Sequence, residues 1–323
     1  MTKHYSDTFL RTVRNKIPIN NVITHLLKME TRYLNKLFRF RCPLCGNYHT
    51  AIKKKTNLAR CFDCKKNYNS NQDYFVTSIA VVDPKSRQFT LFEASPDITS
   101  QLNYISNLLF KRFILPNNIY ITHAHIGHYT GLMYLGRESL GASGLNVRAL
   151  PKMTNFLKNN GPWNQLVKLN NIDLEEIEFD KISSIFNNIE IIPLQVPHRD
   201  EYSETAGYII KGENKKALFI PDIDKWEKWD KDIRDLIQDY DYLLLDATFY
   251  DEKEINRDIN EIPHPLVKQT LDALSNLSPK AKSKIYFIHM NHTNMMLDPE
   301  SHLSRLVLSK GFNIARLGQK LYL

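Results

Sequence analysis

The chain has 323 residues, of which 42% are hydrophobic and 11% aromatic, with only 11 Gly and 14 Pro. This composition excludes a disordered, collagen-like or low-complexity chain, because it provides enough apolar surface for a sizeable core. The formal net charge is +8, yet residues 1–72 hold 15 Lys and Arg against three acids, whereas the remainder holds 28 against 32. This split predicts a basic module at 1–72 and a mildly acidic main domain at 73–323.

Three features set the expected compartment. No apolar run approaches the roughly 18 residues that cross a bilayer, and the first twenty residues lack the apolar segment of a secretory signal. All four cysteines lie in two C-x-x-C pairs within residues 42–64, which in a reducing compartment favours a metal over disulfides. We therefore expect a cytoplasmic protein that makes no membrane contact.

The basic module is expected to combine helix with a zinc ribbon. Residues 5–28 carry apolar side chains at helical spacing, with Ser6 or Asp7 as N-cap, before the two C-x-x-C turns. Four thiolates at this spacing complete a tetrahedral zinc site, without which so small a ribbon has too little core to fold. Redox dithiols are the alternative. The predicted zinc ligands are Cys42, Cys45, Cys61 and Cys64.

The run YSDTFLRTVRNKIPINNVITHLL, followed by CPLC and CFDC, resembles the zinc-binding domain at the start of bacterial DNA primases. That family usually carries a histidine where Cys45 stands, and nothing after residue 72 resembles a primase catalytic domain. The resemblance implies contact with nucleic acid, with contact to a protein as the alternative. The candidate nucleic-acid surface is the basic run Lys53, Lys54 and Lys55.

From residue 73 onward, the pattern changes to strands that alternate with helices. A hairpin is predicted at 76–83 and 88–95, and apolar runs predict strands at 118–124, 189–196, 206–212, 216–222, 240–249 and 284–290. Helical spacing appears at 100–112, 230–238 and 265–276. Because strands repeatedly precede helices, we expect an α/β domain with helices layered against sheet.

Metal-capable side chains stand where four of the predicted strands end. The motif H-A-H-I-G-H closes one strand, and a histidine or an aspartate closes three others. Strand-end loops can bring such side chains together, so the repetition predicts a shared metal centre rather than isolated structural histidines. The candidate ligands are His123, His125, His128, His198, Asp222 and His289.

The segments THAHIGHY, VPH, IPD and IHMNH resemble, in this order, the motifs of the metallo-β-lactamase superfamily. THAHIGHYTGLMYLGRE, NGPWNQL, VPHRDEYSET, LFIPDIDKWEKW and FIHMNHTN are most similar to the branch related to pyrroloquinoline quinone biosynthesis protein B. The resemblance covers residues 76–323 and implies an αββα sandwich, preceded by the helical and zinc-ribbon module, with metal at one edge of the sheets. It implies a first site of His123, His125 and His198, a second with His128 and His289, and Asp222 as the bridge.

Gly127 departs from the superfamily pattern. The hydrolases of that superfamily generally have an aspartate at this position, and this aspartate binds the second metal. The second site therefore has one carboxylate fewer, unless Asp200, Asp224 or water substitutes, and either one ion or two can be expected. Coordination that is rich in histidine and completed by oxygen suits zinc, manganese or iron. Zn²⁺ is our first choice, with Mn²⁺ and Fe²⁺ as alternatives.

A proton donor is expected beside the metal. The run DATFYDEKEINRDINEIPHP places His264 after the strand that ends at Asp246, and it resembles the segment by which phosphodiesterase branches of the superfamily supply a general acid. Asp246 would orient and charge that imidazole, while Asp222 would act at the metal. The predicted substrate contacts are Arg199, Asn291 and His292.

The main hypothesis is a metal-dependent hydrolase that cleaves a phosphodiester in a nucleic acid or nucleotide by a metal-activated water, with the ribbon binding the polyanion. The resemblance to the quinone-biosynthesis branch supports an alternative, a mononuclear iron oxygenase that hydroxylates an aromatic residue of a peptide. Gly127 favours this alternative, because a missing carboxylate favours a single ion. A third hypothesis is a non-catalytic nucleic-acid-binding protein, and a homodimer is compatible with all three.

Overall fold

The computed structural model describes residues 39–41, 48–50, 74–186, 189–254, 258 and 261–323. The chain divides into two compact units, Met1–Asn71 and Gln72–Leu323. In the first unit, β1 (Arg39–Arg41) pairs antiparallel with β2 (Tyr48–Thr50). The two helical segments predicted within 5–28, which Ile17 and Pro18 separate, the four cysteines and Lys53–Lys55 lie outside the described residues. The zinc-ribbon and nucleic-acid hypotheses therefore stay predictions.

The second unit contains two sheets, of which the smaller has the order β3-β4-β5-β6-β7. β3 and β4 form the predicted hairpin, with Ile79 opposite Phe92, and β4 to β7 run parallel. The carboxyl ends of these parallel strands consequently lie at one edge. The strands are β3 (Ile79–Asp83), β4 (Gln88–Phe92), β5 (Asn118–Tyr120), β6 (Leu145–Ala149) and β7 (Ile172–Glu176).

The larger sheet has the order β14-β13-β12-β11-β10-β9-β8. β11 to β14 run parallel, whereas β10 is antiparallel to both β9 and β11. β9 therefore points the same way as β11, so that β9, β11, β12 and β13 end at one edge. The strands are β8 (Ser183–Ser184), β9 (Glu190–Gln195), β10 (Ala206–Lys211), β11 (Lys216–Ile220), β12 (Tyr242–Asp246), β13 (Ile285–Ile288) and β14 (Asn313–Ile314).

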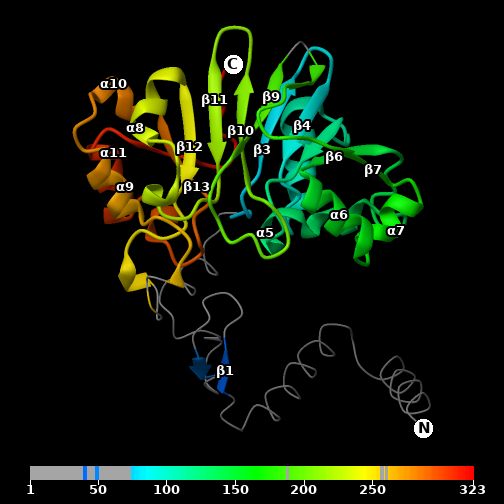
Figure 1. The fold of residues 1–323 in the computed structure, drawn as a ribbon, viewed down its shortest axis with the longest axis horizontal. Helices are drawn as coiled ribbons and strands as arrows, with labels where there is room; N and C mark the ends of the chain where they lie inside the picture. The colour runs from blue at the N-terminus through cyan, green and yellow to red at the C-terminus, as the bar shows by residue number, and fades with distance from the viewer. Residues whose placement is uncertain (1–38, 42–47, 51–73, 187–188, 255–257, 259–260) are drawn as a thin grey trace, which may run out of the picture. The chain divides into compact units, whose positions relative to one another are not determined.

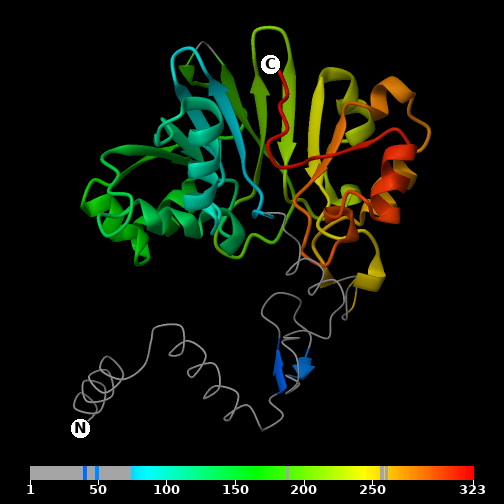
Figure 2. The ribbon, with the colours of Figure 1, turned by 180° about the vertical axis from the view of Figure 1, so that it is seen from behind.

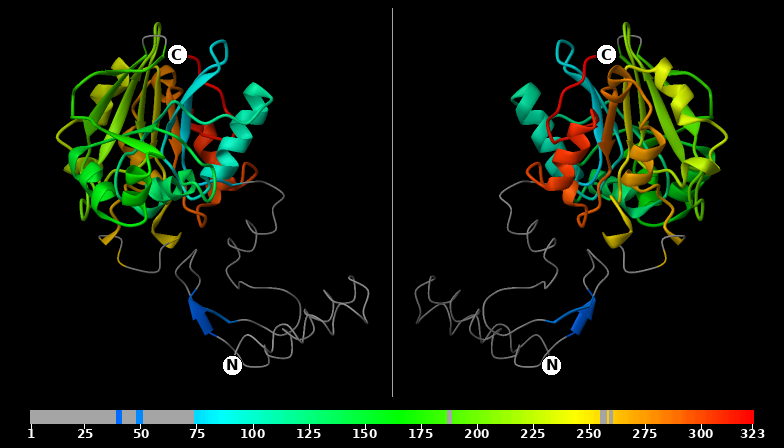
Figure 3. Two further views of the ribbon diagram at one scale, coloured as in Figure 1. Left: turned by 90° about the vertical axis from the view of Figure 1, so that its right-hand side faces the viewer. Right: turned by 90° about the vertical axis from the view of Figure 1, so that its left-hand side faces the viewer.

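Helices pack on the two flanks of the second unit, with α9 to α11 beside β12 and β13 and α6 and α7 beside β6 and β7 (Figure 1). Figure 2 and Figure 3 show the same arrangement from behind and from the sides. None of the described helices combines the length and the apolar character of a membrane span. The α-helices are α4 (Ile98–Ile105), α5 (Ile126–Tyr129), α6 (Pro151–Asn159), α7 (Trp163–Lys168), α8 (Ile233–Leu236), α9 (Val267–Ala273), α10 (Pro279–Lys282) and α11 (His302–Ser309). Shorter helical turns are η1 (Ser106–Phe110), η2 (Thr130–Leu135), η4 (Trp226–Lys228), η5 (Ile237–Asp239), η6 (Glu252–Glu254) and η8 (Met295–Leu297).

Strand β11 shows why its sequence is almost entirely apolar. Ala217 and Phe219 pack in the cluster between the two sheets, whereas Leu218 and Ile220 pack in the cluster beneath α8, α9 and α11. A strand that is covered on both faces needs apolar side chains at successive positions, so alternation with polar residues disappears. A third cluster joins the smaller sheet to α4, α6 and α7. The predicted α/β sandwich with two sheets is confirmed.

An aromatic cluster holds the two sheets together, and its loss is expected to destabilise the second unit. Phe92 is fully buried, with its ring centroid 5.1 Å from that of Tyr120 and 5.3 Å from that of Tyr208. Phe92→Ala should lower the free energy of unfolding by about 3–5 kcal/mol, because it leaves a cavity between the sheets. Urea denaturation measures the loss, with Phe113→Ala, whose side chain is exposed, as the control. Equal losses in the two variants would contradict this account of the core.

Candidate metal centre

The three histidines of the H-A-H-I-G-H motif converge because the chain turns sharply after β5. α5 begins at Ile126, and the His128 N–H donates to the carbonyl oxygen of His125 at 2.9 Å. The ring centroid of His123 lies 4.5 Å from that of His125 and 4.2 Å from that of His128. His123 and His128 are almost completely buried. One short turn thus gathers three imidazoles at the end of the smaller sheet.

His198 and Asp222, from the larger sheet, join two of these histidines. His125 Nδ1 lies 2.9 Å from His123 Nε2 and 3.2 Å from His198 Nε2, and His123 Nε2 lies 3.1 Å from Asp222 Oδ2. One ligand atom from each of the four residues lies within 4.8 Å of every other. We call His123, His125, His198 and Asp222 the cage.

The chemistry of the cage fits a metal ion. Four ligand atoms about 2.1 Å from one tetrahedral ion lie roughly 3.4 Å from each other, close to the spacing of the donors here. Burial lowers the pKa of His123 and of His125, and it lowers that of His198 to about 4. The rings are therefore neutral near pH 7 and can each offer a lone pair, as metal coordination requires.

Asp222 also contacts a second group of side chains. Its Oδ1 lies 2.9 Å from His289 Nδ1 and 3.6 Å from His264 Nδ1, and its Oδ2 lies 2.8 Å from His128 Nε2. Oδ1 is buried and has no hydrogen-bond partner. Its contact with His289 Nδ1 is short, but the geometry of that contact is not that of a hydrogen bond. Asp222 thus stands between the positions predicted for the first and the second metal.

The second group lacks a carboxylate at position 127, and space does not explain this. A Cβ atom on Gly127 would meet only the Val76 side chain, at an ordinary contact distance of 3.5 Å. Among the described residues, neither predicted substitute belongs to a group that could hold a metal. Asp200 accepts a hydrogen bond from Thr205 and Asp224 pairs with Lys228. The second group therefore lacks this carboxylate because residue 127 is a glycine, and not because a larger side chain would clash there.

His264 and Asp246, which we call the dyad, lie next to Asp222. His264 Nδ1 is 2.7 Å from Asp246 Oδ2, and Asp246 is fully buried at the end of β12. Burial disfavours the charged imidazole, but the Asp246 carboxylate outweighs burial and raises the pKa of His264. Since Nδ1 faces Asp246, Nε2 is the atom that remains for proton transfer.

Three further residues orient these groups, and we did not single them out from the sequence. Glu93 is fully buried after β4, with Oε1 3.3 Å from His128 Nδ1. Burial opposes the charge of His128, yet Asp222 and Glu93 together raise its pKa to about 10. The Thr122 hydroxyl lies 2.8 Å from His123 Nδ1, and that of Thr248 donates to Asp246 Oδ1 at 2.7 Å. Of these three residues, only Glu93 could have been recognised from the sequence, as an acidic residue directly after an apolar strand.

None of the three predicted substrate contacts belongs to the cage. Arg199 is exposed on the loop after β9, with Nε 3.6 Å from Glu201 Oε1. The Asn291 side-chain amide donates to Thr293, so it is already engaged within the protein. Burial lowers the pKa of His292. Of the three, Arg199 is the residue best placed to meet a ligand.

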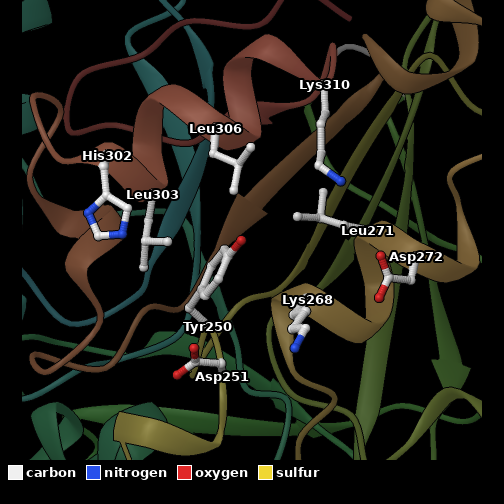
Figure 4. A pocket seen from close by; sticks show the side chains of 9 residues that line it. All are labelled: Tyr250, Asp251, Lys268, Leu271, Asp272, His302, Leu303, Leu306 and Lys310. Atoms are coloured by element: carbon white, nitrogen blue, oxygen red, sulfur yellow. The ribbon is translucent and has the colours of Figure 1, made fainter.

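A separate cavity of about 370 Å³ lies between α9 and α11 (Figure 4). Its floor is apolar, with Leu271 and Leu303, and its rim is charged, with Asp272 and Lys310 among others. It contains none of the residues of the cage or the dyad. The candidate centre therefore rests on converging ligands and not on this cavity.

Glu254 makes the stability of the second unit depend on pH. Burial raises the pKa of Glu254 from its usual 4.5 to about 7, while Tyr250 N and the Thr293 hydroxyl donate to it. A carboxyl group whose pKa is higher in the folded than in the unfolded chain stabilises the fold. This stabilisation is complete at pH values below the unfolded pKa and is lost as the pH rises through the folded pKa. Glu254→Gln should therefore gain stability relative to the wild type by up to about 3 kcal/mol between pH 5 and pH 8.

Urea denaturation at both pH values measures this difference, and Glu213→Gln, an exposed glutamate, is the matched control. The difference between the control and the wild type should be the same at both pH values. A difference between Glu254→Gln and the wild type that is the same at both pH values would contradict the account of Glu254.

Known proteins resemble both the sequence and the fold. A family model described as "Beta-lactamase superfamily domain" matches residues 90–290. Coenzyme PQQ synthesis protein B of Methylococcus capsulatus (strain Bath) is 26% identical over 294 residues, which cover 82% of this chain and 94% of that protein. That of Methylobacterium sp. (strain 4-46) is 25% identical over 268 residues, with 76% and 87% covered.

Two solved structures show the likeness of fold. Zn²⁺-bound PqqB from Methylobacterium extorquens gives a TM-score of 0.68 at 20% identity, over 82% of this chain and 94% of that one. Unliganded yeast PDE1 gives 0.51 at 12% identity, over 76% and 94%. The family match at 90–290 spans more than half of this chain and includes the whole cage. As the histidine motifs predicted, the chain belongs to the beta-lactamase superfamily.

Proposed function

We propose that this chain is a metal-dependent oxygenase of the type that builds quinone cofactors, acting on an aromatic residue of a peptide. The observation that carries the proposal is the cage, in which three neutral imidazoles and one carboxylate converge. In the second group Gly127 supplies no carboxylate, and the carboxylate of Asp246 is engaged by His264 and Thr248, so the ligand set favours a single ion. Relatives named coenzyme PQQ synthesis protein B, one of them covered over 94% of its length, support this assignment.

The cage residues would hold the ion, and the dyad would handle protons. When bound, an ion such as Fe²⁺ would supply Lewis acidity and one-electron chemistry towards O₂. His123, His125 and His198 present neutral nitrogens, and the carboxylate of Asp222 offsets part of the positive charge. His264, oriented through Nδ1 by Asp246, can take up or release a proton at Nε2 beside a substrate hydroxyl.

Apolar side chains next to the cage suit an aromatic substrate. Ile126, which follows His125, is 70% exposed, and Tyr202, which follows Glu201, is 66% exposed. The Tyr202 ring lies 5.6 Å from that of Phe156, so the exposed ring stands on a packed base. Ring stacking on such a side chain contributes about 0.5–1.5 kcal/mol beyond burial. The exposed Tyr202 ring, one residue after the Glu201 that contacts His125, supports an aromatic side chain as the group that approaches the cage.

The dyad also supports a second candidate function, hydrolysis of a phosphodiester. A buried aspartate 2.7 Å from a histidine is an arrangement that can protonate a leaving alkoxide. Arg199, exposed near the cage, could pair with a phosphate. Under this hypothesis, the basic module at 1–72 would bring nucleic acid to the main domain. Its four cysteines would hold zinc, and Lys53–Lys55 would contact the nucleic acid.

Metal analysis combined with two assays distinguishes the candidates. The full chain would be loaded with Fe²⁺, Zn²⁺ or Mn²⁺ and tested for O₂ uptake with a tyrosine-containing peptide and for hydrolysis of bis(p-nitrophenyl) phosphate. Hydroxylation places one oxygen atom on the ring and reduces the other to water, so the first assay contains ascorbate as the two-electron reductant. His125→Ala is the control that should remove either activity.

Each outcome supports one of the three hypotheses. Peptide hydroxylation with a single iron in the main domain supports the oxygenase. Phosphate-ester hydrolysis with two zinc or manganese ions there supports the hydrolase instead. Filled sites with neither activity, together with salt-dependent DNA binding that Lys53/Lys54/Lys55→Ala removes, would overturn both enzymes in favour of a binding protein.

A further inference from the structure

His125 differs from the other two histidines of the cage in how its outer nitrogen is held. Its Nδ1 faces inward, 2.9 Å from His123 Nε2, while its Nε2 lies 3.1 Å from Glu201 Oε2. The outer nitrogen of His123 meets the Thr122 hydroxyl instead, and His198 Nδ1 has no hydrogen-bond partner among the described residues. Within the described part of the chain, His125 alone of these three rings has a carboxylate on its outer nitrogen.

A carboxylate in this place decides where the imidazole proton sits. A neutral imidazole has one N–H, and an ionised carboxylate can only accept a hydrogen bond. With Glu201 on Nε2, the proton is held there and the lone pair is left on Nδ1, which is the nitrogen that faces the cage. A hydroxyl such as that of Thr122 can donate or accept, so it does not impose a tautomer in the same way.

Glu201 lies on a loop that is tied to the histidine turn at two points. The Ala124 N–H donates to the Ser203 hydroxyl at 2.8 Å, and the Ala206 N–H donates to the Thr122 carbonyl oxygen at 3.1 Å. These bonds keep the loop next to the H-A-H-I-G-H turn, even though 47% of the Glu201 side chain is exposed. The carboxylate thus reaches His125 from the solvent side, where a substrate would arrive.

We propose that Glu201 is a positioning residue, which fixes the Nε2–H tautomer of His125 and aims its Nδ1 into the cage. The proposal rests on the proposed metal centre and adds a residue that acts on it through His125. Partners of this kind on metal-binding histidines typically change metal affinity by about 10- to 100-fold. The loop at 199–203 thereby links the surface around the cage to the strength of metal binding.

Zinc affinity, measured by chelator competition on the full chain, tests the proposal. Glu201→Ala should weaken binding by about 10- to 100-fold, and Glu201→Gln should stay within about threefold of the wild type, because its amide oxygen still accepts from Nε2–H. Glu204→Ala removes a nearby carboxylate that contacts Lys152 instead, and it should leave the affinity unchanged. All variants keep the same four cysteines, so differences between them report on the cage.

A second readout needs no metal. The ¹⁵N shifts of the His125 ring in the metal-free chain, at about pH 8 where this ring is neutral, should report the Nε2–H tautomer in the wild type and in Glu201→Gln, but a mixture in Glu201→Ala. Equal tautomers and equal zinc affinity in wild type and Glu201→Ala would overturn the role of Glu201. A wild type that shows the tautomer but binds no ion at the cage would overturn the proposed function and leave this role standing.

Discussion

Asp222→Ala is expected to abolish metal binding at the cage and, with it, any turnover. Asp222 is the carboxylate of the cage, and each of its two oxygens lies within 3.6 Å of imidazole nitrogens from two histidines. The four histidines are His123 and His128 at Oδ2 and His264 and His289 at Oδ1. Removing it takes away one ligand and the negative charge that offsets a bound cation. The desalted variant should hold about one ion fewer per chain than the wild type, and activity should fall below about 1%.

Asp224→Ala is the matched control for this variant. Asp224 lies two residues further along the same loop, but its carboxylate pairs with Lys228 at 2.7 Å and does not join the cage. Metal content by elemental analysis should therefore be unchanged. Wild-type metal content in Asp222→Ala would contradict the assignment of the cage.

Asp246→Asn should have the second-largest effect, and it should act on turnover instead of on metal content. Asp246 Oδ1 accepts from the Thr248 N–H and hydroxyl, and Oδ2 faces the Ile223 N–H and His264 Nδ1. The NH₂ group of an asparagine would therefore face a donor in either orientation, and the ring would lose its charged partner. Loss of a positioned proton donor typically lowers turnover by about 10²- to 10⁴-fold. Because Asp246 raises the pKa of His264, the alkaline limb of the pH–rate profile should move to lower pH.

The control for the dyad is His264→Ala, alone and combined with Asp246→Asn. If the two residues act as one unit, the double variant should lose about as much activity as either single variant. Steady-state kinetics and elemental analysis are measured on all three. Loss of an ion in Asp246→Asn would show instead that Asp246 is a metal ligand, since it also belongs to a group of four side chains that could hold one.

The sequence predicted the cage because of how strands are arranged in sheets. His123 follows β5, His198 follows β9 and Asp222 follows β11, and the ends of like-directed strands meet at one edge. A histidine or an aspartate at successive strand ends could thus be recognised without knowing the strand order. β6 and β7 escaped notice because LNVRA and IDLEE mix charged with apolar residues, and they become strands by pairing with β5 and with each other.

Residues that hold the ligands could not be predicted in the same way. Glu201 contacts a histidine 76 positions earlier in the chain, and as part of the polar run HRDEYSE it is indistinguishable from an ordinary surface loop. Thr248 orients Asp246 through one hydroxyl, and a threonine after a strand is too common to be a signal. Such partners are determined by the packing of one loop on another, which local sequence patterns do not encode.

Anomalous diffraction from crystals of the metal-loaded chain, recorded at the iron and zinc absorption edges, tests the central claim most directly. The account predicts one strong peak in the main domain, bounded by His123 Nε2, His125 Nδ1, His198 Nε2 and a carboxylate oxygen of Asp222. A fully loaded crystal with no peak among these four atoms, or with its ion bound elsewhere in the main domain, would contradict it.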